Sequence, residues 1–305
     1  MPEHPKTFLS TKEVAELLDV NEKVVYSLIS EKGLPACKVT GKWIFPRHLV
    51  EKWIESHVIN YPGDSPVTSE TLLVIAGSND PLMERTIALY NSKRGDTLAV
   101  FGSTGSLGGL KALNRKLCHI ATSHLMHSDE EEYNFAYLEE HIDGPLPAVV
   151  NFCFREQGIM VAKGNPKRIE NIASLAKTGI KIANRQKGTG TRLLLEHELK
   201  KAGIDPSKVN GYGSEFPTHL AVGLEVLSGR ADAALGIKAV ASLLNLDFIP
   251  VRKERYDLLI LKDRFFDKPI QKFLGFLQDE AFKNLASTLD GYDLGMTGKM
   301  VFPGS

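Results

Sequence analysis

From residue 72 onward the sequence alternates short apolar runs with helical apolar patterns, and this alternation constrains the fold more than any other feature. The runs expected to form strands are residues 72–76, 97–101, 118–121, 158–161, 180–183 and 233–236. Strands that alternate with helices indicate an α/β fold with a mostly parallel sheet. Because the pattern resumes after residue 157, we expect two such α/β units.

Small hydroxyl residues and glycine recur where these strands meet the following helices. Three such turns are Ser78-Asn79, residues 103–106 and residues 189–191. Ligands of open α/β sheets bind beyond the carboxyl ends of the strands, where a helix N-terminus offers free N–H groups to an anion. Three turns divided between two units therefore predict an anion site, although any single serine there could be an ordinary N-cap.

Residues 10–56 follow a different pattern, in which two short helices are followed by a hairpin and a third helix. Ser10 and Glu13 have capping-box spacing, and Asn21 could cap a second helix after a three-residue turn, which is a helix-turn-helix arrangement. Residues 36–39 and 42–45 read as a hairpin around Thr40-Gly41. A third helix is expected to open at Pro46-Arg47. The side chains expected to face inward are Val14, Leu17, Leu18, Leu49, Val50, Trp53 and Ile54.

Composition indicates a globular chain and narrows its partners. The 37 basic and 37 acidic residues cancel, so any affinity for DNA must come from a local patch such as the basic, acid-free stretch between Lys32 and Val50. The sequence contains no run of eighteen apolar residues, so we expect no membrane span, and we expect no signal peptide. Cys37, Cys118 and Cys153 form no CxxC pair, so we expect buried free thiols and a cytoplasmic location.

The expected organisation is a DNA-binding module, a linker and a larger ligand-binding region. We place a winged helix-turn-helix domain at 1–60, a linker rich in turn formers at 61–70 and a bilobal domain at 71–305. Lobe one is expected at about 71–155 and 253–305, and lobe two at about 156–252. Residues 57–70 carry no heptad repeat, so a homo-oligomer would have to form through another part of the chain.

The N-terminal module resembles the excisionase and MerR-like winged helix-turn-helix family. The residues that carry the resemblance are 10–15, 33–36 and 41–45. It implies that residues 21–30 enter the major groove of double-stranded DNA and that the wing contacts the neighbouring backbone. The residues expected at DNA are Asn21, Lys23, Tyr26, Lys32, Lys38, Thr40, Lys42 and Arg47. The alternative is a protein-interaction module with a solvated charged face.

The larger region resembles the type II periplasmic binding-protein fold, and more narrowly the intracellular molybdate-binding-like domains. The segments that carry the resemblance are residues 76–81, 102–110, 119–125, 184–192, 228–233 and 254–258. It implies an oxyanion, tungstate or molybdate, held between two lobes. The implied ligand residues are Ser78, Asn79, Ser103, Thr104, Ser106, Thr189, Gly190, Thr191, Arg192 and Tyr256. Arg192 could equally be an exposed helix residue, and Tyr256 a packed hinge aromatic.

Other polar residues of the larger region were weighed against this site. His124 and His127 are spaced i,i+3 without a matching carboxylate or cysteine, so we interpret them as structural and expect no metal site. Asp80 could be a carboxylate ligand or simply a helix cap. Glu215 and His219 precede a helix and are not placed in the site.

The leading hypothesis is a one-component transcriptional regulator that senses tungstate or molybdate, with sulfate and phosphate next. A regulator with an organic effector, such as an amino acid or carboxylate, is the alternative. No Ser-His-Asp, Cys-His or paired-carboxylate constellation is apparent in the spacing. An enzyme on the same fold is therefore the third hypothesis, and we expect the protein to have no enzymatic activity.

Overall fold

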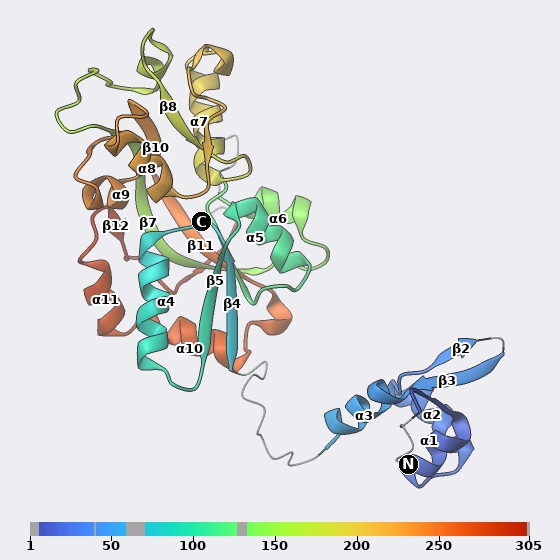
Figure 1. Ribbon diagram of the computed structural model, residues 1–305. Coiled ribbons are helices and arrows are strands. Elements are labelled where there is room, and N and C mark those ends of the chain that lie inside the picture. Colours follow the sequence, from blue (N-terminus) through green and yellow to red (C-terminus); the bar gives the residue numbers. More distant parts are fainter. Residues whose placement is uncertain (1–5, 40, 59–70, 127–132, 304–305) are drawn as a thin grey trace, which may run out of the picture. The chain divides into compact units, whose positions relative to one another are not determined.

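The computed structural model describes residues 6–39, 41–58, 71–126 and 133–303 (Figure 1). The chain forms two compact units, residues 1–65 and 66–305, each of which is described by itself. Thr40, His127 and the expected linker at 61–70 lie outside the described residues.

The first unit contains three helices and a three-stranded antiparallel sheet. Its elements are β1 (Phe8–Ser10), α1 (Thr11–Leu18), α2 (Glu22–Lys32), β2 (Cys37–Val39), β3 (Lys42–Pro46) and α3 (Arg47–Ser56). Ser10 and Glu13 form the predicted capping box, and the Asn21 side chain accepts the Val24 N–H at 3.1 Å. The first strand, β1, was not predicted; it pairs with β3, so the sheet order is β1-β3-β2.

The core of the first unit is small and was predicted only in part. Val14, Val25, Phe45 and Val50 are fully buried. Leu17 and Leu49, by contrast, are 45% and 38% exposed, so their predicted inward orientation was wrong. Leu9 of β1, Ala15 of α1 and Leu34 complete the core, which leaves these two leucines outside.

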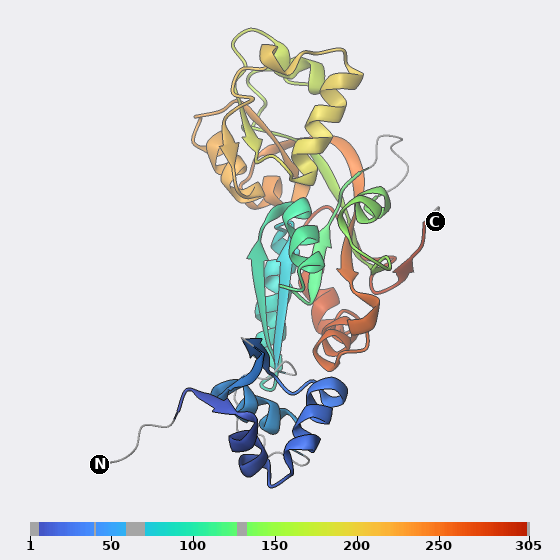
Figure 2. The same cartoon turned by 90° about the vertical axis from the view of Figure 1, so that its right-hand side faces the viewer.

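The second unit has two lobes with helices on both faces of one continuous sheet (Figure 2). Lobe one begins with β4 (Leu72–Gly77), α4 (Pro81–Lys93), β5 (Leu98–Ser103), α5 (Gly105–Asn114), β6 (Ile120–Ser123) and α6 (Phe135–His141). Lobe two contains η1 (Ile172–Ala176), β8 (Ile182–Arg185), α7 (Gly190–Lys201), η2 (Pro206–Lys208), β9 (Glu215–Phe216), α8 (His219–Leu227), β10 (Ala233–Ile237) and α9 (Lys238–Leu243).

Two strands of fourteen residues, β7 (Ala148–Val161) and β11 (Asp247–Ile260), pair antiparallel and run through both lobes. The chain then finishes with η3 (Lys262–Arg264), α10 (Lys268–Phe276), α11 (Glu280–Ala286), β12 (Tyr292–Asp293) and β13 (Met300–Val301). The helices α10 and α11 pack on lobe one (Figure 1). There Phe273 and Phe276 join the core with Tyr90. We call β7 and β11 together the crossing strands.

The sheet order is β5-β4-β6-β11-β7-β10-β8-β9, with β12 and β13 added to β7. The pairs within each lobe, such as β4 with β5 and β8 with β10, are parallel as predicted. The crossing strands pair antiparallel with their neighbours, so the expectation of a mostly parallel sheet was wrong at its centre. The reason is that β7 and β11 carry the chain between the lobes in opposite directions.

Two further predictions concern cysteines and membranes. All three cysteines are free; Cys118 and Cys153 are buried as predicted, whereas Cys37 is exposed on β2. Within the described ranges, no helix combines the length and apolar character needed to cross a bilayer.

Candidate anion-binding site

One face of the crossing strands is lined with buried polar side chains. Arg155 of β7 lies opposite Glu254 of β11, and Tyr256 lies opposite Cys153. Because side chains alternate along a strand, Arg155, Gln157, Glu254 and Tyr256 share one face of the pair. All four are buried.

Arg155 holds two carboxylates on this face. Its Nε donates to Glu254 Oε1 and its Nη1 to Asp80 Oδ2, both at 2.6 Å. Asp80 also caps α4 by accepting the Leu82 N–H at 2.8 Å, and Tyr292 donates to its other oxygen. Burial alone would lower the pKa of Arg155, but Glu254 and Asp80 outweigh it and raise that pKa. The guanidinium is therefore always charged.

Glu254 also orients a histidine, which in turn contacts a serine. His124 Nδ1 lies 2.7 Å from Glu254 Oε2, and His124 Nε2 lies 2.9 Å from Ser78 Oγ. A carboxylate only accepts hydrogen bonds, so we assign the proton to Nδ1, and Nε2 accepts the Ser78 hydroxyl. Burial lowers the pKa of His124 despite Glu254, so the ring is neutral at pH 7.

Lobe two contributes a second buried arginine, Arg185, at the end of β8. Its Nη1 donates to the Phe216 carbonyl at 2.9 Å, and its Nε has no hydrogen-bond partner. Within the described ranges no carboxylate forms an ion pair with it, although the residue is only 1% exposed. Burial, and then the charge of Arg155, lower the pKa of Arg185 to about 10, so the group remains cationic at pH 7.

Two more unpartnered groups lie at helix N-termini of lobe two. His219, the first residue of α8, is fully buried, and neither ring nitrogen has a hydrogen-bond partner in the described structure. Burial, and then Arg185, Arg155 and His124, lower the pKa of His219 well below its usual value. Thr191, in the first turn of α7, has a buried Oγ1 that is also unpartnered. The charge of Arg185 acts on His219, and α7, which carries Thr191, packs beside β8, which ends at Arg185. We call Arg185, His219 and Thr191 the cationic end of the candidate site.

The lobes touch each other at the same helix N-termini. The Leu107 N–H of α5 donates to the Gly188 carbonyl at 3.3 Å. Gly190, at the start of α7, faces the His124 ring so closely that a Cβ there would lie 2.4 Å from Cε1. The structure therefore has its lobes closed over the polar groups, which leaves the unpartnered atoms sealed from solvent.

The predicted ligand residues divide into three groups. Ser78, Ser106, Gly190 and Thr191 are buried around the polar groups. Ser103 and Thr104 are exposed.

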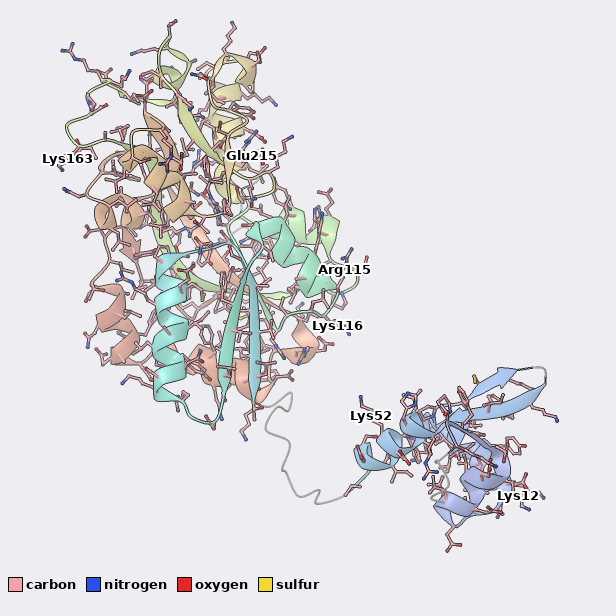
Figure 3. The ribbon with its side chains drawn as sticks, viewed as in Figure 1. Lys12, Lys52, Arg115, Lys116, Lys163 and Glu215 are labelled. Atoms are coloured by element: carbon pink, nitrogen blue, oxygen red, sulfur yellow. The ribbon has the colours of Figure 1, made fainter. Side chains whose placement is uncertain are left out.

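The remaining predicted residues have partners within the protein. Asn79 donates to Glu84, and the Thr189 Oγ1 caps α7 by accepting the Arg192 N–H. Arg192 is buried rather than exposed: it stacks on Tyr212 and pairs with Glu196 and with Glu215, which is labelled on lobe two in Figure 3. Tyr256 donates to the Ser78 carbonyl at 2.6 Å.

Sequence reasoning missed the charged members of the site. Arg185 is the last residue of β8 and His219 the first residue of α8, but nothing in their local sequence distinguishes them from ordinary residues at the ends of elements. Ser78, His124 and Glu254 are far apart in the sequence, so their contact could not be recognised. Their connectivity is that of a serine–histidine–acid triad, which the spacing of these residues in the sequence did not indicate. The described residues contain no group of side chains arranged to hold a metal ion.

The residues predicted to contact DNA lie on α2 and the wing. Lys23, Tyr26, Lys32, Lys38 and Lys42 are exposed. The amide oxygen of Asn21 is engaged as a cap, and Arg47 pairs with Glu51 at 2.8 Å, so both are less free than predicted.

Comparison with known proteins matches a family model to each of the two units. A family model described as a PBP superfamily domain matches residues 88–278. The chain belongs to the PBP superfamily. A second model, described as a helix-turn-helix domain, matches residues 8–58 of this PBP-superfamily member. The protein YvgK of Bacillus subtilis (strain 168) is 30% identical over 304 residues, which cover 95% of this chain and 96% of YvgK.

Solved structures agree on the fold of the PBP-like unit. A phosphate ABC transporter substrate-binding protein from Clostridium perfringens with bound phosphate aligns with a TM-score of 0.54 at 13% identity, over 72% of this chain and 99% of that one. A tungstate ABC transporter protein from Geobacter sulfurreducens aligns with a TM-score of 0.52 at 14% identity, over 72% and 100%. A helix-turn-helix domain joined to a PBP-like domain fits a DNA-binding regulator with a ligand-binding domain.

Proposed function

We propose that this protein is a DNA-binding transcriptional regulator whose second unit binds a small anion between its lobes. The observation that carries the proposal is Arg185, a buried cation without a carboxylate partner. A buried charge is costly unless it is paired, so native proteins supply a partner for it. An anionic ligand between the closed lobes would be that partner, and His219 and Thr191 would supply further hydrogen bonds.

The resemblance to molybdate-binding-like domains makes tungstate and molybdate the first candidates, followed by sulfate and phosphate. The two related transport receptors, described as phosphate and tungstate proteins, share the fold. An organic carboxylate such as an amino acid is the alternative, because a buried arginine without an acidic partner suits a carboxylate equally well. In each case the protein would act in the cytoplasm, where it has access to DNA.

The first unit would read DNA in the manner of excisionase and MerR-like proteins. The exposed Lys23 and Tyr26 of α2 would reach base edges, and Lys38 and Lys42 of the wing would contact phosphates. Ligand binding changes DNA affinity only if the two DNA-binding conformations differ in their affinity for the ligand.

The test begins with selection of a bound sequence from random double-stranded DNA by the full chain. Each candidate anion is then titrated against that DNA. We expect one of them to change the DNA dissociation constant by about 5- to 150-fold, the usual range of allosteric coupling. No enriched sequence would contradict the DNA-binding role, and an affinity unchanged by every anion would contradict regulation by an anion.

The wing can be tested on the same DNA. Replacing Lys38 and Lys42 by glutamine should lower the slope of log affinity against log salt by about 0.9 for each lost phosphate contact. Lys12 and Lys52, both labelled in Figure 3, lie on other helices of the first unit, and their replacement by glutamine serves as the control. Equal effects of the two pairs would contradict a specific role for the wing.

A second candidate function, hydrolysis, is favoured by the triad-like contact of Ser78, His124 and Glu254. In that case Ser78 Oγ would attack the acyl carbon of an anionic ester while its proton passes to His124, which would give it to the departing alkoxide so that the alcohol leaves. Water, losing a proton to His124, would then hydrolyse the acyl-serine, release the acid and restore the Ser78 hydroxyl. Incubation of the protein with small anionic esters tests this. Turnover that is abolished by Ser78→Ala would establish the enzyme, and unchanged esters would exclude this reaction for the esters used.

A further inference from the structure

The inference below rests on the proposed anion site and concerns the chemical group that the ligand must have besides its negative charge. We propose that the ligand is a small anion with a hydrogen-bond donor on its opposite side. Its negative end would lie at Arg185, and its hydroxyl, protonated oxygen or ammonium group would lie at Ser78 and Gln157. Protonated phosphate and small hydroxy or amino carboxylates share this chemistry, whereas tungstate, molybdate and sulfate lack the donor at neutral pH.

The first observation is the polarity of Ser78. Glu254 can only accept a hydrogen bond, so it takes the Nδ1 proton of His124, and the Ser78 hydroxyl donates to Nε2 at 2.9 Å. A hydroxyl has one proton, which is thereby used. Towards a ligand, Ser78 Oγ can only accept, which is opposite to the donor role that an oxyanion would need from it.

The second observation is Gln157, on the same face of the crossing strands. Its Nε2 donates to Glu254 Oε2, and this fixes which end of the amide is nitrogen because the carboxylate cannot donate. Its Oε1 is then a buried acceptor without a partner. The neutral ring of His219 adds one more free acceptor along with one donor. An anion without hydrogen atoms would leave the Gln157 oxygen unsatisfied.

The third observation is the uneven distribution of charge between the two ends. Asp80 and Glu254 both pair with Arg155, whereas Arg252, opposite Gln157, pairs with Glu198. The two carboxylates at Arg155 therefore carry an excess negative charge. In lobe two, Arg185 has no acid. A fully deprotonated dianion would face the carboxylate pair, whereas a ligand that is anionic at one end and a donor at the other matches both ends.

Calorimetric titration of the full-length protein at pH 6.5 tests this with pairs of similar shape. Phosphate, which keeps a proton at this pH, is compared with sulfate, molybdate and tungstate; glycolate and glycine are compared with acetate. We expect the tightest ligand to carry a donor and to bind at least tenfold more tightly than its donor-free counterpart. A smaller preference, or a tightest ligand without a donor, overturns the inference while leaving the anion site intact. If nothing binds, the proposed anion site fails as well.

Two variants separate the donor end from the cationic end. In each ligand pair, Ser78→Ala should reduce the preference for the ligand with a donor by about tenfold. It should lower the affinity for the donor-free ligand much less. Arg185→Met should weaken both members equally, by 100-fold or more. Ser92→Ala, an exposed serine of α4, is the control for Ser78→Ala and should change neither affinity. If Ser78→Ala weakens both members equally, Ser78 donates to the anion and the inference is wrong.

Discussion

At the scale of single residues, the buried Arg155 and Arg185 differ in whether the protein itself neutralises them. Arg155 contacts Asp80 and Glu254 at 2.6 Å, whereas the Arg185 side chain donates to the Phe216 carbonyl and forms no ion pair within the part of the chain that the structure describes. Removing one partner of a buried ion pair leaves an uncompensated charge, which costs about 3–5 kcal/mol. Removing a buried charge that has no ionic partner leaves no unpaired charge behind, so it carries no such cost.

The first prediction follows from this difference. Without added anions, Arg155→Met should lower the free energy of unfolding by about 3–5 kcal/mol. Arg185→Met, a replacement of similar length, should leave it unchanged or raise it. Urea unfolding of both variants in chloride buffer measures this. A comparable loss in Arg185→Met would mean that Arg185 is a structural residue and would remove the main support for the anion site.

The second prediction concerns pH. The folded protein lowers the pKa of His219 well below 6.5, whereas the unfolded chain has the ordinary value of about 6.5. Above that pH both states are neutral and stability is complete. Below it the unfolded state binds a proton that the folded state does not, so stability falls by about 1.4 kcal/mol per pH unit. Urea unfolding between pH 7.5 and 5.5 should show this loss of unfolding free energy. His219→Gln should remove the part that comes from His219 and leave the similar part that comes from His124.

The site residues were predictable only where their local sequence carries a signal. Ser78 and Thr191 stand in hydroxyl-rich turns between a strand and a helix, and the structure buries both around the polar groups. Arg185 and His219 are distinguished by the absence of partners, which depends on every other chain segment. Such a property cannot be read from residues close in sequence.

At the scale of elements, the crossing strands explain the largest gap in the sequence-based prediction. Only residues 158–161 of β7 were expected as strand, although it spans Ala148–Val161. Strands are recognised by apolar residues on their buried face. Here that face carries Arg155 and Gln157, which read as loop residues because charged and amide side chains are usually exposed. The elements that hold the site were therefore the hardest to predict.

The third prediction concerns closure of the lobes at α7. A Cβ at Gly190 would lie 2.4 Å from the His124 ring, so Gly190→Ala should hold the lobes apart. Ligand affinity should fall at least tenfold, and the decrease in radius of gyration that the ligand causes in the wild type should be lost in X-ray scattering. Gly213→Ala, where nothing lies within 4 Å, is the control. Unaltered binding in Gly190→Ala would show that the ligand does not require this closure.

At the scale of the whole molecule, the sequence pattern was sufficient for the architecture but not for the ligand. The α/β region with two lobes and the preceding helix-turn-helix domain are confirmed, because strand and helix periodicities are local and repeated many times. The narrower excisionase-like assignment stays a prediction. The tungstate or molybdate ligand also stays a prediction, and the donor requirement inferred at Ser78 and Gln157 argues against it. One fold hosts many ligands, so the choice among them rests on a few side chains.

The central claim is that Arg185 makes the space between the lobes an anion site. Thermal unfolding of the wild type and of Arg185→Met, each with tungstate, molybdate, sulfate, phosphate, glycolate or glycine, tests it most directly. A ligand that binds only the folded state raises the unfolding temperature. We predict that at least one anion raises that of the wild type and that the same anion has no effect on Arg185→Met. Equal increases in both proteins would contradict the claim.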